Sequence, residues 1–293
     1  ENGVPLVQVL DHTVTPMGGR LLRKWVVLPL LHAEHIRARH SVVRALVDDA
    51  VLLQDLDECL RSIGDLERLI SKVPLGKVNP REVRSLAKAL SAIKPIKALL
   101  ADSGNAVLDE IASRLDDLPA VCAEIDRQLK ETPAVNLNKG GVIADGFDPT
   151  LDELRGITRN GKDMLAGIQQ REAERTGINS LKIGFNNVFG YYLEVTNKYK
   201  DQAPEEWTRK QTLTNAERYI TEELKVLEDK ILNAEDKILQ REEELYEELV
   251  VWLQQYIAPV QDNATQIGKL DCLLSFAKVA NRNRYVEPVL DDS

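Results

Sequence analysis

Hydrophobic side chains recur at intervals of three and four residues along the first third of the chain. Between 52 and 70 this spacing places on one helical face Leu52, Leu53, Leu56, Leu60, Ile63, Leu66 and Ile70. Breaks fall at Pro29, at 73–76 and at Asn79–Pro80, where Asn79 can cap a helix and Pro80 can occupy its first turn. The pattern from 16 to about 100 therefore predicts successive helices joined by short loops.

Two longer apolar repeats follow a further predicted helix over 107–130 and a loop over 138–141. A helix from about 150 to 175 carries an apolar stripe formed by Leu151, Leu154, Leu165 and Ile168. A helix from about 216 to 256 repeats apolar residues every seven positions, at Leu224, Ile231, Ile238, Leu245 and Trp252. We expect these two helices to pack as an antiparallel coiled coil.

Between these helices, over 178–214, the period of the pattern changes to two. Leu181, Ile183 and Phe185 alternate with polar or small residues, which is typical of a strand. Asn186-Asn187 can then turn the chain, and two more strands are expected over 190–196 and 207–213. The predicted fold class is mainly α, with a helical core, two long antiparallel helices and a small β-sheet domain inserted at their tip.

The composition of the chain indicates a globular protein without membrane spans or disulfides. The 293 residues carry a net charge of −9, with 43% hydrophobic and 29% charged residues, as in globular proteins that bury a core. The longest apolar run, 25–31, is far too short for the roughly 20 residues of a membrane span. Three widely spaced cysteines offer no disulfide framework, which favours a reducing, intracellular location. Because the chain begins without methionine or a signal region, we expect it to be a piece of a longer protein.

Charge is distributed unevenly between the predicted sheet and the helix after it. Residues 178–220 hold six bases and five acids, whereas 222–248 hold eleven acids and four bases. The sheet segment also holds seven of the 14 aromatic residues, which a small sheet can use as its core. Its polar residues offer neutral donors to phosphate oxygens, namely Asn186, Asn197, Gln211, Thr212, Thr214 and Asn215. An acidic helix is usually a solvated face, but here it would also confine contact with nucleic acid to the sheet.

Motifs for catalysis and metal binding are weak. Gly156 to Lys162 matches a phosphate loop, but Asp163 replaces the final Ser or Thr and the segment has helical rather than strand spacing. His32, His35 and His40 lack a second pair of ligands and are interpreted as exposed helix residues. We therefore expect no catalytic residue, metal site or cofactor in this piece, and no ATPase activity.

Several motifs resemble MutS-type DNA mismatch repair proteins, and the resemblance covers essentially the whole chain. The segments that carry it are Thr15–Trp25, Gly64–Arg68, Leu151–Arg155, Glu174–Ile178, Lys182–Asn186, Phe189–Tyr192 and Gln211–Tyr219. The resemblance implies a core with two lever helices over 1–161 and 222–293, and a clamp domain inserted at 162–221. It also implies that a mismatch-reading domain and an ATPase domain lie outside this piece.

Expectations for the parent protein follow from the same resemblance. They are a bacterial, cytoplasmic DNA-dependent ATPase that uses ATP and Mg²⁺, forms a homodimer, closes its clamps over duplex DNA and works with a MutL-type partner. In this piece the clamp would bind the DNA backbone without sequence preference, and the levers would couple it mechanically to the rest. Two alternatives stay open: a coiled-coil structural adaptor that binds protein and not DNA, and an NTPase that uses 156–162.

The resemblance further implies which residues touch DNA. The family's clamp contacts correspond to Asn186 in Gly-Phe-Asn, to Lys210 before Gln-Thr-Leu, and to Thr214 and Asn215 before Ala-Glu-Arg. Relatives often carry lysine at the position of Thr214, so we expect a clamp whose binding is weaker and less sensitive to salt. For Asn215, a helix cap before Ala216 is an equal alternative.

Overall fold

The computed structural model describes residues 3–101 and 103–291, and the chain divides into two compact units. The first unit comprises Glu1–Asn136 and Tyr246–Ser293, and the second comprises Leu137–Leu245. Both are rich in helix, and a four-stranded antiparallel sheet lies in the second, which confirms the predicted fold class. The predicted clamp boundaries, 162 and 221, fall inside the second unit and stay predictions.

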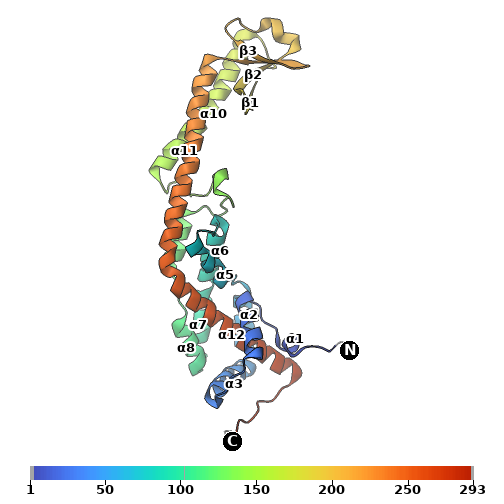
Figure 1. The fold of residues 1–293 in the computed structure, drawn as a ribbon, viewed down its shortest axis with the longest axis vertical. Helices are drawn as coiled ribbons and strands as arrows, with labels where there is room; N and C mark the ends of the chain where they lie inside the picture. The colour runs from blue at the N-terminus through green and yellow to red at the C-terminus, as the bar shows by residue number, and fades with distance from the viewer. Residues whose placement is uncertain (1–2, 102, 292–293) are drawn as a thin grey trace. The chain divides into compact units, whose positions relative to one another are not determined.

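The first unit is built around α12 (Ile257–Asn283), which is buried on almost every side. Figure 1 shows α12 in red with the blue helices α2 and α3 beside it. The other helices of the first unit are α1 (Leu6–Leu10), α2 (Pro16–Val27), α3 (Ala33–Asp48), α4 (Ala50–Arg61), α5 (Leu66–Lys72), η1 (Val73–Leu75), α6 (Pro80–Ser91), α7 (Ile93–Ala101), α8 (Ala106–Arg114), α9 (Pro119–Gln128) and η4 (Gln254–Tyr256).

The ends of these helices follow local capping chemistry. Asn79 forms a capping box with Glu82 at the start of α6, and Pro80 occupies its first position, as predicted. The single helix predicted over 107–130 is wrong, because the structure divides it into α8 and α9. Pro119 starts the second helix, and Leu118 before it has a φ of 44°, a backbone conformation that no helix interior contains.

A buried carboxylate joins the start of α2 to α12. Asp271 is fully buried and accepts hydrogen bonds from the backbone N–H groups of Val14 (3.0 Å) and Thr15 (2.7 Å) and from the Thr15 hydroxyl (2.6 Å). Burial raises the pKa of this carboxyl, and the bonds from Thr15 and Val14 oppose that shift. The carboxylate lies directly against Gly18, where a Cβ atom would be 2.1 Å from Asp271 Oδ2.

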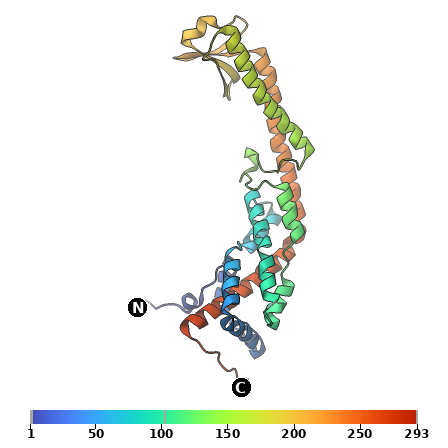
Figure 2. The same cartoon turned by 180° about the vertical axis from the view of Figure 1, so that it is seen from behind.

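The second unit contains two long helices that run side by side. They are α10 (Pro149–Thr176) and α11 (Glu222–Leu253), whose last residues belong to the first unit (Figure 2). Ion pairs near the two ends of α10, Arg171–Glu223 and Arg241–Asp148, show that the two helices are antiparallel. The buried residues between them include Leu165, Ile168, Leu224, Leu227 and Ile231, so the predicted pairing of apolar stripes is confirmed.

Gly161 packs directly against Ile231 of α11 and gives a test of the packing of these helices. A Cβ atom at Gly161 would lie 2.6 Å from Cγ1 of Ile231. A Cβ atom at Gly167 of the same helix would have no neighbouring atom within 4 Å. We expect Gly161→Ala to lower the free energy of unfolding by about 1 to 2 kcal/mol through overpacking. Gly167→Ala should raise it by up to about 1 kcal/mol through helix propensity. Urea denaturation measures both, and equal effects would contradict the close packing.

A buried ion pair ties the loop before α10 to α11. The carboxylate of Glu242, which is fully buried, accepts a bond of 2.6 Å from the guanidinium of Arg155 and one of 3.0 Å from the backbone N–H of Val142. Arg155 also donates to the carbonyl of Ile143 (2.8 Å). These contacts close the loop that contains η2 (Leu137–Lys139) against both helices.

The sheet of the second unit has four strands in the order β1-β2-β4-β3. They are β1 (Lys182–Asn186), β2 (Gly190–Thr196), β3 (Thr208–Thr212) and β4 (Ala216–Ile220), with η3 (Asn197–Gln202) between β2 and β3. All neighbours are antiparallel. The sheet packs on α10 and α11 through Leu193, Val195, Trp207 and Tyr219, which agrees with the interpretation of its aromatic residues as core.

The fourth strand corrects the predicted start of the second long helix. Ala216–Ile220 pairs with β2, with Glu217 opposite Val195 and Tyr219 opposite Leu193. Helix α11 begins only at Glu222, where the Thr221 hydroxyl accepts a bond from the N–H of Leu224. Heptad spacing holds from Leu224 onward but says nothing about residues before it, so extending the helix to 216 was wrong.

Candidate nucleic-acid interface

One face of the sheet packs on the hydrophobic core and carries an internal ion pair. Arg209 pairs with the carboxylate of Glu217 at 3.2 Å, and the hydroxyl of Tyr219 donates to the same carboxylate at 2.5 Å. The bond from Tyr219 and the charges of Arg209 and Lys200 lower the pKa of Glu217. Burial, then the bond to Glu217, raises the pKa of Tyr219 to about 12. Arg209 is therefore already neutralised within the sheet.

The opposite face carries a stack of three residues. The ring of Tyr192 covers Gly184, where a Cβ atom would lie 2.6 Å from the tyrosine oxygen. The guanidinium of Arg218 lies 4.3 Å from the centroid of that ring and donates to Glu194 at 3.1 Å and to Gln211 at 2.9 Å. Gly184 and Tyr192 thus serve the architecture of the sheet, and Arg218 is also paired internally.

Asn186, the first predicted contact, lies where β1 ends and is half-buried. Its side-chain oxygen accepts a bond of 2.8 Å from the N–H of Val188, so it forms the predicted turn into β2. Glu228 of α11 accepts from the N–H of Tyr191 at 2.7 Å and lies against Gly190, whose φ is 75°. Burial, Glu235 and Glu228 raise the pKa of Tyr191, so this end of the sheet lies beside acidic side chains.

Lys210, the second predicted contact, lies in a β-bulge. Arg209 pairs with Tyr219 and Gln211 with Arg218, so Lys210 is the extra residue of the edge strand β3. Its side chain is exposed. A bulge changes the direction of the edge strand locally, which separates Lys210 from the paired arginine before it.

Thr214 and Asn215 form the exposed turn between β3 and β4. Asn197, at the start of η3, holds this turn: its side-chain amide donates to the carbonyl of Thr214 at 2.9 Å, and its backbone N–H donates to the carbonyl of Asn215 at 3.1 Å. The alternative of a helix cap at Asn215 is wrong, because strand β4 and not a helix follows it.

The four predicted contacts do not form one cluster. Asn186 pairs with Gly190 at one end of β2, whereas Ala216, which follows the turn, pairs with Thr196 at the other end. The six steps from Gly190 to Thr196 separate these ends by about 20 Å at the usual strand rise. Lys210, Thr214 and Asn215 belong to one hairpin, and Asn186 lies apart from them.

The distribution of ion pairs distinguishes arginines from lysines in this region. Arg209, Arg218 and Arg175 pair with Glu217, Glu194 and Glu206, respectively. Within the described part of the chain, no ion pair is formed by the four lysines of the sheet domain, Lys182, Lys198, Lys200 and Lys210. Their charges are therefore available to an anionic ligand.

Two residues with structural roles were not identified from sequence. Asn197 is one of the polar residues predicted to donate to phosphate, but its bonds to the turn depend on where η3 lies against the hairpin. Glu228 has no distinguishing signal, because it is one of many acids on α11. Both roles arise from contacts between distant parts of the sequence.

The remaining motifs do not form a chemical site. Gly156 to Lys162 is part of the continuous helix α10, and Gly161 packs on Ile231, so the segment is no phosphate loop. His32 and His35 are exposed on or next to α3, as predicted, but His40 is only partly exposed and lies 3.7 Å from the carboxylate of Glu287. Among residues 3–101 and 103–291, no group of three or more histidine, cysteine or acidic side chains could hold a metal ion.

None of the described helices is long and apolar enough to cross a bilayer.

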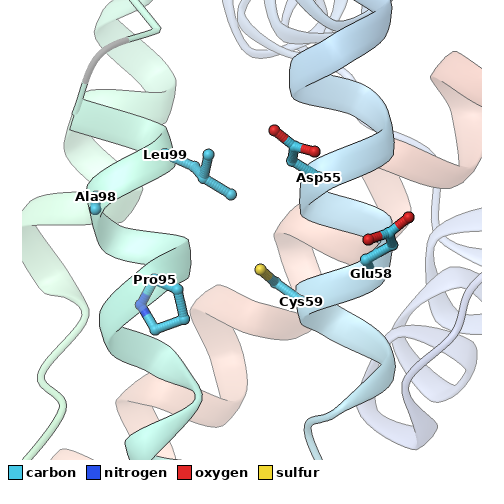
Figure 3. A pocket seen from close by; sticks show the side chains of 6 residues that line it. All are labelled: Asp55, Glu58, Cys59, Pro95, Ala98 and Leu99. Carbon is cyan, nitrogen blue, oxygen red and sulfur yellow. The ribbon is translucent and has the colours of Figure 1, made fainter.

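A shallow pocket in the first unit also lacks reactive chemistry. Cys59 on α4 and Leu99 on α7 point toward one another across it, and Asp55 and Glu58 lie on the same helix as the thiol (Figure 3). Burial and these two acids raise the pKa of the Cys59 thiol, which keeps it protonated. The pocket offers neither a nucleophile nor a positive charge for a substrate.

Comparison with known proteins identifies the family. The sequence model described as MutS domain III matches residues 1–277. Proteins named DNA mismatch repair protein MutS from Christiangramia forsetii, Bacteroides thetaiotaomicron and Flavobacterium johnsoniae are each 51% identical to this chain over its whole length. The chain spans about a third, 34%, of the length of each. A family match over nearly the entire sequence, with relatives at this identity, shows that the chain belongs to the MutS family of mismatch repair proteins and carries its domain III.

Proposed function

We propose that this chain binds the backbone of duplex DNA, without sequence preference, through the sheet of its second unit. The observation that carries this function is the set of unpaired lysines on a sheet whose arginines are already neutralised by acids. An ammonium group without an internal partner can replace the counterions of a phosphate, and the release of those ions drives binding. The acidic helix α11 repels phosphate and so limits contact to the sheet.

Backbone binding fits the chemistry better than base reading. Lysine, threonine and asparagine side chains on turns and edge strands supply donors to phosphate oxygens, which position a protein on DNA without reading its sequence. Lys210, Thr214 and Asn215 present these groups on one exposed hairpin. Base reading requires an element that enters a groove and aligns side chains with base edges.

The parent protein has further properties under this proposal. It is a cytoplasmic DNA-dependent ATPase that uses ATP and Mg²⁺, acts as a homodimer and works with a MutL-type partner, and its ATPase domain lies outside this chain. The names of the relatives, which describe mismatch repair proteins about three times as long, support this assignment. The continuous helix α11 provides the lever, because it runs from Glu222, after the sheet, to Leu253 without interruption.

Lys210→Ala tests the proposed function directly. The chain should bind duplexes with a dissociation constant of about 10⁻⁴ to 10⁻⁶ M or weaker, the usual non-specific range. Lys210→Ala should weaken binding to matched and mismatched duplexes alike and lower the slope of log affinity against log salt by about one. Lys237→Ala, which removes an exposed lysine from α11, is the matched control and should leave the slope unchanged. Fluorescence anisotropy between about 50 and 200 mM salt measures these slopes.

Two further variants sharpen that experiment. Thr214→Lys should steepen the slope by about one, because it adds a cation to the exposed turn. Asn186→Asp keeps the oxygen that accepts from Val188 but adds a negative charge, so it weakens binding only if this end of the sheet touches DNA. A strong preference for mismatched duplexes, or equal slopes for Lys210→Ala and Lys237→Ala, would contradict backbone binding by the sheet. Absence of any DNA binding would favour the adaptor alternative.

A further inference from the structure

The short helix η3 lies against the hairpin that carries the predicted contacts. Asn197 begins η3 and is bonded to both residues of the β3–β4 turn, at 2.9 Å to the carbonyl of Thr214 and at 3.1 Å to that of Asn215. In a 3₁₀-helix, side chains three residues apart lie above one another. Lys200 therefore lies on the same face of η3 as Asn197, the face that contacts the turn.

The described acidic side chains near η3 form no ion pairs with its two lysines, so these lysines can contact an external phosphate. Lys200 and Lys198 are exposed, and neither forms an ion pair within the described residues. Glu217, whose pKa the charge of Lys200 lowers, is already engaged by Arg209 and by the hydroxyl of Tyr219. Lys200 consequently has no ion-pair partner among the described residues and can contact an external phosphate.

Lys198 has a less favourable position. It shares its face of η3 with Asp201, three residues later, and its ammonium lies 5.1 Å from the centroid of the Tyr199 ring. The exposed Glu205 also follows within the same loop. Lys198 should therefore contribute less than Lys200 to the attraction of a phosphate.

The two ends of the sheet differ in sign. The end with Asn186 lies beside Glu228, which contacts Gly190 and the N–H of Tyr191. The end with Thr214 and Asn215 lies beside η3 and its two unpaired lysines. A polyanion therefore meets unpaired lysines at the second end and the carboxylate of Glu228 at the first.

We infer that η3 and the β3–β4 turn form one phosphate-binding surface, in which Lys200 is the principal cation, Lys198 a secondary one and Asn197 a positioning residue. This inference rests on the proposed function and extends it to a segment outside the predicted contacts. Because Thr214 has no charge of its own, the cations that attract DNA to the turn come from η3 and from Lys210.

Substitutions in η3 test this surface with the whole chain and a duplex of arbitrary sequence. Lys200→Gln should lower the salt slope by about one, and Lys198→Gln should lower it by less. Asn197→Ala removes the bond to the Thr214 carbonyl and should weaken binding at low salt without changing the slope, because it removes no charge. Lys237→Gln on α11 is the control for loss of a lysine from the same chain.

The outcomes separate this inference from the proposed function. If Lys210→Ala lowers the slope but Lys200→Gln behaves like Lys237→Gln, η3 is not part of the surface and the proposed function still holds. If neither Lys210→Ala nor Lys200→Gln differs from the control, both fail. A larger effect of Lys198→Gln than of Lys200→Gln would overturn the assignment of faces. Protection of Lys200 from acylation by bound duplex provides a second readout that is independent of stability.

Discussion

Glu242→Ala is expected to lower the free energy of unfolding of the second unit by about 3 to 5 kcal/mol, the usual cost of breaking a buried ion pair. The substitution leaves the guanidinium of Arg155, whose side chain is 16% exposed, without its most buried partner. It also leaves the N–H of Val142 without an acceptor. Arg155 keeps its pair with Asp145 at 2.7 Å, but that carboxylate is exposed and does not replace a buried partner, and the buried N–H of Val142 gains no new acceptor.

Trp207 allows this loss to be measured in the unit concerned, because it is buried in the core of the sheet. Urea denaturation would be followed by its fluorescence in a background where Trp25 and Trp252 are replaced by phenylalanine. Glu243→Ala, on the exposed side of α11, should change stability by no more than about 0.5 kcal/mol. A loss below about 1 kcal/mol for Glu242→Ala would mean that the pair is not buried as described.

A double replacement separates the pair from its surroundings. Arg155→Met with Glu242→Leu removes both charges and fills the space with apolar side chains. Because the cost of desolvating the charges disappears together with their attraction, the double variant should lose less stability than Glu242→Ala alone. A loss equal to the sum of the two single replacements would indicate that the residues act independently.

Gly18→Ala is expected to lower the stability of the first unit by about 3 kcal/mol, the upper end of the cost of overpacking. The added methyl group would lie 2.1 Å from Oδ2 and 2.8 Å from Cβ of Asp271. Asp271 cannot move without losing its bonds to Thr15 and Val14. The gain in helix propensity, about 1 kcal/mol, is too small to compensate for this loss.

Gly19→Ala provides the matched control, because its Cβ atom would approach only the hydroxyl of Thr13, at 3.3 Å. We expect it to be close to neutral. Hydrogen exchange of the α12 amides reports the difference, since Asp271 lies on that helix. Exchange that is equally fast in the two variants would show that the carboxylate is not held against Gly18.

The helices could be predicted because their signals are local. Apolar spacing and caps such as Asn79 lie within a few residues of each other, and the structure follows them. Strand β4 could not be predicted in the same way. Its residues become a strand because they pair with β2, twenty or more residues earlier in the chain, and no short window contains that partner.

Residues of the motifs that identify the family contact partners that lie far away in the sequence. Arg20, from the first motif, forms a bidentate pair with Asp65 of the second, at 2.7 and 2.8 Å. Arg155 reaches Glu242, 87 positions later. A single sequence contains both members of each pair but does not show that they meet.

The kinds of residue in the candidate interface were predictable, but their arrangement was not. Strand order decides that Asn186 and Thr214 lie at opposite ends of the sheet, and that order depends on the unpredicted strand. The same strand brings η3 to the turn through Asn197. Sequence therefore predicted a polar sheet with six bases and five acids, whereas the structure places Glu228 beside one end and the unpaired lysines of η3 beside the other.

The bulge at Lys210 also bears on how these molecules behave at high concentration. Strand β3 lies at an edge of the sheet, where unpaired backbone groups can recruit a strand from another copy. The irregular register and the side chains of Thr208, Arg209 and Lys210 make this edge a poor template, because a second strand would need regular pairing and would bring like charges together. Lys210 thus helps to keep separate copies of the sheet from aggregating, independently of any ligand.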